Sequence, residues 1–207
     1  MTSKGYPLKP RRPVLPGSPH GDRFNESPRM TVLILPGLGG SGPAHWQSRW
    51  QAADPTFRRV VQRDWYAPVL AEWLDALDAA VAAAPAPVVL AAHSLACVLV
   101  AHFARCAQAQ RIAAAFLVAP ADVESTSAAS SSLRGFAPIP REALPFRSVV
   151  IASSADPYIS IGRARFLAAK WRARFIDVGD QGHINVESGH GDWPDGRALL
   201  DDLVSTL

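Results

Sequence analysis

The sequence predicts one α/β domain, in which a mostly parallel sheet of about six strands lies between two layers of helices. Short apolar runs alternate with stretches of helical periodicity from residue 31 to the end of the chain, and this alternation is typical of repeated strand–helix units. Residues 88–92 contain no polar side chain, as expected for a strand covered on both faces. The length of 207 residues and the 48% hydrophobic content suit one folded core.

The first half of the domain begins with an apolar, β-branched run at 31–35, which ends at Pro-Gly and predicts a strand. A helix is expected near 44–53 and a second strand at 60–63. Residues 69–84 carry apolar side chains at helical spacing and are followed by two prolines. They therefore predict a helix that ends before those prolines.

The second half continues the alternation from the apolar strand at 88–92. The remaining strands are expected at 112–118, 149–153 and 175–178, and the remaining helices at 95–108, 161–171 and 197–207. Ligands of such sheets bind beyond the carboxyl ends of the strands. Functional residues are therefore expected where a strand passes into a loop.

Residues 1–29 are expected to form a poorly packed basic tail that precedes the domain at 30–207. Prolines recur in the tail without a helical or strand period, which favours extended chain. The tail has a net charge of +4, and the rest of the chain −1. Arg11-Arg12 is not followed by the apolar run that an export signal needs. Met30 directly precedes the first strand, so a later start of translation remains open.

Charge, hydropathy and cysteine content argue against several classes of partner. A near-neutral domain presents no phosphate-binding face, so no nucleic acid is expected. The longest mostly apolar window, 88–104, is shorter than the roughly 20 residues that span a bilayer, so no membrane is expected. Cys97 and Cys106 would lie ~13 Å apart on a helix, which is too far for a disulfide. Two reduced cysteines suit the cytoplasm.

The first junction with chemical potential is a glycine-rich loop after the strand at 31–35. Gly37, Gly39 and Gly42 match the pattern G-x-G-x-x-G, and Asp64 follows about one strand later, as in a dinucleotide site. The same loop suits an oxyanion hole, because small residues let a backbone N–H approach a substrate carbonyl. A tight turn without a ligand is the third interpretation, and the loop alone does not decide among them.

The second junction is Ala92-His93-Ser94-Leu95-Ala96, between the most apolar strand and a helix. A nucleophile elbow needs small residues two positions before and after its serine, because the turn is sharp and strained. Such a turn lifts the Ser94 hydroxyl above the sheet and directs the Leu95 N–H at an oxyanion, beside a helix N-terminus. The simpler interpretation is a serine that caps the helix.

The third junction is a pair, Asp156 and His183, each of which follows a predicted strand. A serine nucleophile needs a base to accept its proton, and the base needs an acid to orient its ring. The order Ser94, Asp156, His183 is the order of serine hydrolases built on such sheets. We therefore predict a catalytic triad of these three residues.

Two rival sites explain less of the sequence. A dinucleotide-binding oxidoreductase leaves the triad unexplained and has little room for a separate substrate domain. A metal site at His183, Glu187, His190 and Asp192 lacks the H-E-x-x-H spacing of a metal-binding helix. We therefore expect neither a metal nor another cofactor. His190 is the alternative base, although only His183 directly follows a predicted strand and turn.

Four motifs of the domain occur together. They are Leu-Pro-Gly-Leu-Gly-Gly-Ser-Gly-Pro-x-His-Trp at 35–46, Ala-His-Ser-Leu-Ala at 92–96, Asp-Pro-Tyr at 156–158 and Gly-His-Ile-Asn at 182–185. In this set the chain resembles the small serine hydrolases of the retinoblastoma-binding protein 9/YdeN family. The resemblance implies a single-domain α/β-hydrolase fold with a minimal cap, the same triad, and esterase or peptidase-like activity. The resemblance also implies partner binding through a Leu-x-Cys-x-Glu motif, as in the mammalian member. The matching segment of this chain, 95–99, has leucine at position 99 in place of the glutamate, so the partner of the mammalian member is not expected here.

The predicted reaction is hydrolysis of a small ester or amide through an acyl-enzyme on Ser94, as a carboxylesterase in the first instance. The N–H groups of Leu38 and Leu95 are expected to hold the oxyanion. A small-molecule acyl substrate is the expected partner of a monomer or small homo-oligomer. The alternative is a non-catalytic interaction protein that keeps the hydrolase fold.

The sequence also offers candidate residues for the substrate pocket. His45, Trp46 and Tyr158 are candidate substrate-binding residues, and Trp46 is equally well explained as a core residue. Residues 121–145 are rich in serine and proline. They predict either a lid or a loop without fixed structure.

Overall fold

The computed structural model describes residues 30–125 and 131–207, and its centre is a six-stranded sheet in which all neighbouring strands are parallel. The strand order is β2-β1-β3-β4-β5-β6. The strands are β1 (Thr31–Leu35), β2 (Phe57–Arg59), β3 (Val88–His93), β4 (Ile112–Val118), β5 (Arg147–Ala152) and β6 (Arg174–Asp177). The predicted fold class is confirmed. The predicted tail at 1–29 lies outside the described residues.

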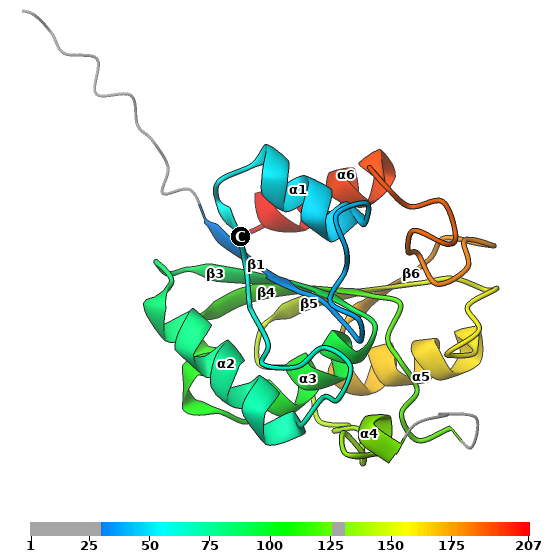
Figure 1. Cartoon of the computed structure of the whole chain (residues 1–207), viewed down its shortest axis with the longest axis horizontal. Helices are drawn as coiled ribbons and strands as arrows, with labels where there is room; N and C mark the ends of the chain where they lie inside the picture. The colour runs from blue at the N-terminus through cyan, green and yellow to red at the C-terminus, as the bar shows by residue number, and fades with distance from the viewer. Residues whose placement is uncertain (1–29, 126–130) are drawn as a thin grey trace, which may run out of the picture.

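Helices cover both faces of the sheet (Figure 1). One face carries α1 (Trp46–Ala53) and α6 (Pro194–Ser205), and the other carries α2 (Leu70–Ala83), α3 (Leu95–Phe103) and α5 (Ile161–Trp171). The connections contain a short helix, α4 (Ser131–Arg134), and a 3₁₀ helix, η1 (Ala107–Arg111). Within the described ranges, no helix is both long and apolar enough to cross a membrane.

Alternate residues of β1 enter two separate cores, because successive side chains of a strand point to opposite faces. Leu33 and Leu35 pack in the core under α2 and α3. Val32 and Ile34 pack in the core under α1 and α6. The wholly apolar strands seen in the sequence therefore follow from a sheet that is covered on both sides.

The strand order places the switch point of the fold between β1 and β3. From β1 the chain moves outward to β2 and then returns to form β3 on the other side of β1. The connections that follow β1 and β3 lead to helices on opposite faces, which opens a crevice at the carboxyl ends of the two strands. Leu35 lies beside Ala92 in the ladder. The glycine-rich loop after Leu35 and the turn at Ser94 therefore leave the sheet side by side.

The second strand lies three residues earlier than the predicted 60–63, so that prediction is wrong. Phe57 pairs with Val32, and its side chain is buried. Val60 donates its N–H to the Ile34 carbonyl at 2.9 Å as the chain leaves the sheet. The side chain of Val61 is 70% exposed. Two consecutive valines favour a strand in the sequence, but only the first of them reaches the sheet.

The helix predicted at 95–108 ends at Phe103, so the last part of that prediction is wrong. Beyond Phe103 the backbone tightens, and the Cys106 N–H donates to the Phe103 carbonyl, three residues back, at 2.8 Å. The chain then forms η1, from which the Arg111 guanidinium donates to the Ala84 carbonyl at 2.8 Å. Carbonyls at a helix C-terminus have no partner in their own helix. The early end of α3 thus lets Arg111 cap α2.

Where it is described, at 121–125 and 131–145, the predicted lid or loop packs against the helices. Phe136 is fully buried against Trp73 of α2, with ring centroids 5.6 Å apart. The Trp171 indole N–H on α5 donates to the Pro140 carbonyl at 2.7 Å. These contacts anchor the segment to two helices. Residues 126–130 lie outside the described part of the chain.

Gly196 on α6 allows packing to be tested against helix propensity. A Cβ at Gly196 would lie 2.2 Å from ring atoms of Trp193, and that ring stacks on Trp50 with centroids 5.9 Å apart. Alanine is favoured over glycine inside a helix by about 1 kcal/mol, whereas overpacking a core costs about 1–3 kcal/mol. We expect Gly196→Ala to lower the free energy of unfolding by about 1–2 kcal/mol in urea denaturation.

Gly162→Ala on α5 is the matched control, because a Cβ there meets nothing within 4 Å. It is expected to leave the free energy of unfolding unchanged or raise it by up to about 1 kcal/mol. Equal effects of the two substitutions would contradict the packing argument.

Candidate active site

Ser94 stands in a strained turn between β3 and α3. Its backbone has a φ of 56° and a ψ of −122°, and a non-glycine residue in such a conformation costs of order 1–3 kcal/mol. The turn is held because the Ser94 N–H donates to the Val118 carbonyl of β4 at 2.9 Å. Ala92 and Ala96, two positions away on either side, are fully buried. The small side chains at these positions thus allow the sharp turn that the sequence predicts.

Ser94, His183 and Asp156 form a continuous chain of hydrogen bonds. His183 Nε2 lies 2.9 Å from Ser94 Oγ, and His183 Nδ1 lies 2.9 and 3.0 Å from the two carboxylate oxygens of Asp156. A carboxylate only accepts, so Nδ1 carries the proton and Nε2 is free to accept from the serine hydroxyl. The Asp156 carboxylate is fully buried, and the imidazole is 9% exposed. The structure therefore brings together all three residues that the sequence singles out.

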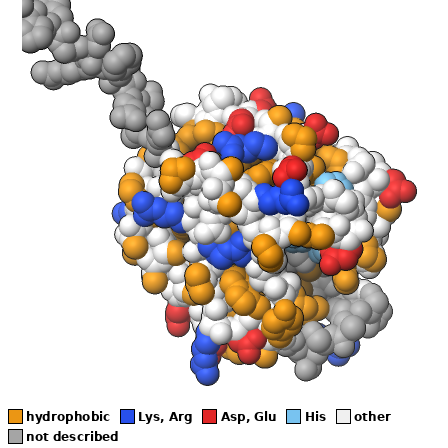
Figure 2. Space-filling model, turned by 45° about the horizontal axis from the view of Figure 1, so that its top comes forward, with side chains coloured by type: hydrophobic (Ala, Val, Ile, Leu, Met, Phe, Trp, Pro, Cys, Tyr) orange, Lys and Arg blue, Asp and Glu red, His pale blue; other side chains and the backbone are white. Residues whose placement is uncertain are grey.

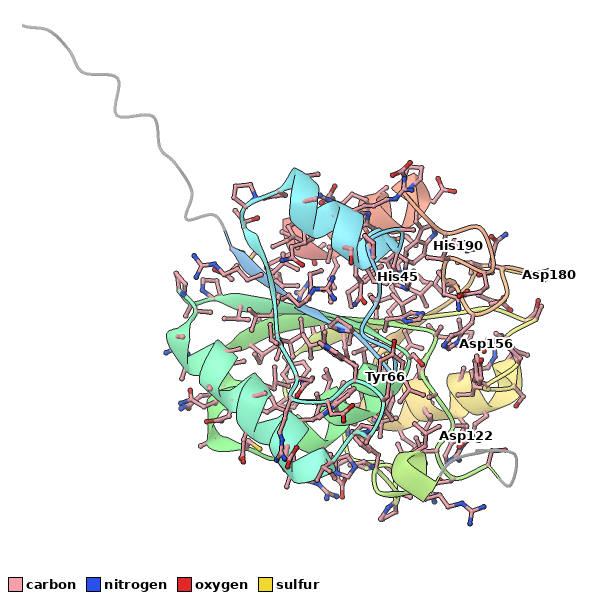
Figure 3. The ribbon with its side chains drawn as sticks, in the orientation of Figure 1. His45, Tyr66, Asp122, Asp156, Asp180 and His190 are labelled. Atoms are coloured by element: carbon pink, nitrogen blue, oxygen red, sulfur yellow. The ribbon has the colours of Figure 1, made fainter. Side chains whose placement is uncertain are left out.

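Asp156 lies on the loop that follows β5 (Figure 3), and His183 lies on the loop that follows β6. The Asp156 carboxylate also accepts the Tyr158 N–H at 2.9 Å, which fixes its orientation. The loop that carries His183 is anchored at two carbonyls. The Trp46 indole donates to Ile184 O at 3.0 Å, and the His93 imidazole donates to His183 O at 2.9 Å. Both anchors are buried side chains, Trp46 from α1 and His93 from the end of β3.

Trp46 lies in the core and does not line the cavity, which corrects its prediction as a substrate-binding residue. It is fully buried. Its ring packs on Trp50 and Trp193, with centroids 4.5 and 5.2 Å away. The reason is its position on α1, whose first turn faces the sheet and not the crevice. Of the two interpretations open in the sequence, the core residue is correct.

Leu38 and Leu95 both line the cavity, and their backbone N–H groups have no hydrogen-bond partner in the described parts of the chain. Gly37 explains how the two segments come so close. A Cβ on Gly37 would lie 2.9 Å from both His93 O and Ser94 Cβ, so only glycine fits between the loop and the turn. The loop that carries Leu38 thus lies against the turn at Ser94, and the N–H groups of Leu38 and Leu95 stay the candidate donors of an oxyanion hole.

The dinucleotide pattern does not have the packing that its chemistry requires. Its third glycine normally allows close packing of helix and strand, but a Cβ on Gly42 would meet nothing within 4 Å. Asp64, the expected ribose ligand, accepts the N–H groups of Tyr66 and Ala67 at 2.7 and 2.9 Å. The observed packing of Gly37 and Gly42 therefore favours the oxyanion interpretation of the loop.

The four candidate metal ligands make separate contacts. His183 contacts the serine and the aspartate described above, and Asp192 pairs with Arg49 at 2.6 Å. The ring nitrogens of His190 lie 3.1 Å from Ser188 Oγ and 3.0 Å from the Gln181 side-chain carbonyl. Across residues 30–125 and 131–207, no three His, Cys, Asp or Glu side chains are grouped to hold a metal ion. His183, and not His190, faces Ser94.

A cavity of about 310 Å³ opens above Ser94. Four of its lining residues form a row of rings, with centroids 4.8 Å apart from His45 to His93, 4.8 Å from His93 to His183, and 4.5 Å from His183 to Tyr158. Figure 2 shows histidine surface between apolar side chains on the right of that view. The cavity is lined by Leu38, Gly39, Ser41, Gly42, His45, His93, Ser94, Leu95, Ala121, Leu133, Tyr158, His183, Asn185, Val186 and Glu187.

Several lining residues carry no clear signal in the sequence. His93 belongs to the turn motif at 92–96 but has no predicted role of its own, and Leu133 comes from the segment predicted as a lid or a loop without fixed structure. Glu187 follows the Gly-His-Ile-Asn motif by two residues and is considered from the sequence only as a metal ligand, whereas it lines the cavity. His45 and Tyr158, both predicted as pocket residues, do line the cavity, and Tyr158 is largely exposed at its mouth.

The histidines beside His183 are held neutral. Burial, with a smaller contribution from the Arg59 charge, lowers the pKa of His45 to about 4. Burial lowers the pKa of His93 well below its usual value. His45 Nδ1 accepts the Gln47 N–H at 3.2 Å as the N-cap of α1, so its proton sits on Nε2. That atom is buried with no partner among the described groups.

The low pKa of His45 predicts acid lability. The unfolded chain binds this proton at a higher pH than the folded chain, so stability is lost as the pH falls from about 6.5 towards 4. At pH 4.5 the titration of His45 lowers the free energy of unfolding by an amount on the order of 2 kcal/mol relative to pH 7. Asparagine keeps a capping oxygen without titrating. We therefore expect His45→Asn to lose less free energy of unfolding than wild type between pH 7 and 4.5; equal losses in urea denaturation would contradict the assignment.

Comparison with known proteins agrees with this architecture. Residues 32–202 match the family model described as serine hydrolase. A YdeN-like hydrolase from Pectobacterium atrosepticum is 32% identical, with a TM-score of 0.77 over 86% of this chain and 91% of that one. No curated protein sequence is detectably similar.

More distant structures share the fold. The ydeN gene product of Bacillus subtilis is 23% identical, with a TM-score of 0.70 over 85% of this chain and 99% of that one. Esterase 2 of Thermogutta terrifontis is 15% identical, with a TM-score of 0.63 over 86% and 83% of the two chains. The chain therefore belongs to the serine hydrolase family, as a YdeN-like member with the α/β-hydrolase fold.

Proposed function

We propose that the protein hydrolyses small esters or amides through an acyl-enzyme on Ser94. The observation that carries the proposal is the chain of contacts from Ser94 Oγ through the His183 imidazole to the buried Asp156 carboxylate, with each link 2.9–3.0 Å long. The serine hydroxyl is weakly nucleophilic alone and needs such a base. Membership of the serine hydrolase family supports the same reaction class.

In the proposed reaction, His183 Nε2 accepts the Ser94 proton as Oγ attacks the substrate carbonyl. The negative charge that develops on the carbonyl oxygen is stabilised by the N–H groups of Leu38 and Leu95. The imidazolium then protonates the departing alcohol or amine, and the acyl group stays on Ser94. Water, deprotonated by the same imidazole, releases the carboxylic acid and restores the hydroxyl. Asp156 keeps its charge throughout and stabilises the imidazolium.

The cavity suits a short acyl group. Its volume of about 310 Å³ lies at the low end for small-molecule sites. Leu38, Leu133 and Val186 give it apolar walls, with Tyr158 at the mouth. Esterase 2 of Thermogutta terrifontis was crystallised with butyrate and with propionate, and this supports short acyl chains for a cavity of this fold.

A fluorophosphonate tests the nucleophile directly. We expect one adduct on the wild-type chain by intact-mass spectrometry, and none on Ser94→Ala. With p-nitrophenyl butyrate, Ser94→Ala and His183→Ala are each expected to lower kcat by about 10⁶-fold, because these residues act as a unit. Asp156→Asn is expected to lower it by about 10⁴-fold, through the wrong imidazole tautomer.

Turnover by Ser94→Ala at near wild-type rates would refute the assignment of the nucleophile. A folded wild type that neither reacts nor turns over would favour the non-catalytic interaction protein. Thermogutta terrifontis esterase 2 is known phosphonylated by cyclosarin, so the probe chemistry suits this fold.

The carboxylate of Glu187 predicts that the enzyme disfavours negatively charged substrates. Its exposed carboxylate lines the cavity and makes no ion pair with any residue in the described ranges. A carboxylate in a substrate would be repelled by about 1 kcal/mol at the surface. We expect Glu187→Gln to raise kcat/KM for a p-nitrophenyl hemisuccinate by about 5-fold at low salt. The neutral butyrate ester is the control and should not respond; an equal response of both esters would contradict the electrostatic explanation.

A further inference from the structure

Side chains hold the far half of the glycine-rich loop. Arg59 of β2 donates from Nη1 to the Gly40 carbonyl at 2.6 Å. Ser48 of α1 donates from Oγ to the Ser41 carbonyl at 2.6 Å, and Ser41 Oγ donates to Gln47 Oε1 at 2.7 Å. Ser41 has a φ of 49°, which is uncommon for a residue other than glycine. These contacts therefore hold the loop in a conformation that its backbone does not favour.

Gln47 is the centre of these contacts. It lies in the first turn of α1, and its side chain is fully buried. Its Nε2 donates to the carbonyls of Leu35 and Ala91, both at 3.0 Å. Leu35 precedes Leu38 by three residues, and Ala91 precedes Ser94 by three residues. One amide thus bonds to both strands that deliver the proposed reacting groups, and to the loop beside them.

Both polar atoms of the Gln47 amide have hydrogen-bond partners, because Oε1 accepts one hydrogen bond and Nε2 donates two. Burying an amide is costly unless its groups are bonded, and an apolar side chain would fill the same space without that cost. Gln47 does not line the cavity. It can therefore influence the reaction only through the groups to which it is bonded.

We propose that Gln47 is a positioning residue that sets the spacing of the two oxyanion donors, the N–H groups of Leu38 and Leu95. The proposal rests on the proposed function, because it concerns the same site. Oxyanion donors act at roughly 2.7–3.1 Å from the developing oxyanion of the substrate. A misplacement of these donors by about 1 Å costs about 10²-fold in rate. A loop released from Gln47 would lose this spacing while the triad stayed intact.

Two substitutions test the proposal. Gln47→Met keeps the length of the side chain and removes its three side-chain hydrogen bonds. Ser41→Ala removes the hydrogen bond between the loop and Gln47 and leaves the two bonds from Gln47 to the strands in place. We expect kcat for p-nitrophenyl acetate to fall about 10- to 100-fold in both, with KM changed less than about 3-fold. The Ki of a boronic acid, which forms a tetrahedral adduct with serine, should rise by the same factor as kcat falls.

Val149→Ala is the control for a loss of stability alone. Val149 is buried in β5, near the amino end of that strand and away from the site. Active sites in every variant are counted by the end-point of fluorophosphonate labelling. We expect Val149→Ala to lower the melting temperature while its kcat per labelled site, its KM and its boronic acid Ki stay at wild-type values. A merely structural role of Gln47 would give the same result in Gln47→Met.

If the wild type is active, and both variants keep a kcat per labelled site and a boronic acid Ki within about 2-fold of the wild-type values, this proposal alone is overturned. A wild type that neither reacts with fluorophosphonate nor turns over would overturn the proposed function, and this proposal with it. If Gln47→Met does not fold, Ser41→Ala decides, because Ser41 lies on the loop outside the buried core.

Discussion

The close contact between Gly37 and the turn at Ser94 is the constraint on which the site depends. It arises from the topology, because β1 and β3 are adjacent parallel strands and both chains leave the sheet at the same edge. The next residues diverge to helices on opposite faces, so the two segments touch only over a few atoms. There is no room for a Cβ on Gly37. At the same contact a Cβ on Gly37 would lie 3.3 Å from Leu95 N at the start of α3, so Leu38, the next residue, follows directly from this contact.

Much of the site could be predicted because its chemistry follows directly after strands. Ser94, Asp156 and His183 lie one, four and six residues beyond the ends of their strands, and parallel strands bring their carboxyl ends to one edge. The order of these three residues along the sequence, each after a strand, was therefore enough to predict that their side chains lie close together. Trp46 and Gln47 show the limit. Both lie in the first turn of α1, and which way each faces depends on how α1 packs against the sheet, which periodicity over eight residues does not specify.

The buried histidines affect the electrostatics of the proposed reaction. During acyl transfer His183 becomes positively charged. His93 lies 4.8 Å from it, and His45 lies 4.8 Å further along the row. A charge on either ring would oppose the imidazolium. Burial keeps both rings neutral by lowering their pKa values, so the buried Asp156 carboxylate is the charge in direct contact with His183. The row supplies hydrogen bonds and packing without a competing positive charge.

Strained backbone and buried polar contacts occur together around this site. Ser41, Ser94 and Ile184 all have positive φ values, of 49°, 56° and 50°. Each has a hydrogen bond that holds it: from Ser41 Oγ to the Gln47 amide, from the Ser94 N–H to a β4 carbonyl, and from the Trp46 indole to Ile184 O. A strained residue persists only when its surroundings over-determine it. The polar groups buried in α1 are therefore best explained by the loops they restrain, since two of these three hydrogen bonds come from α1.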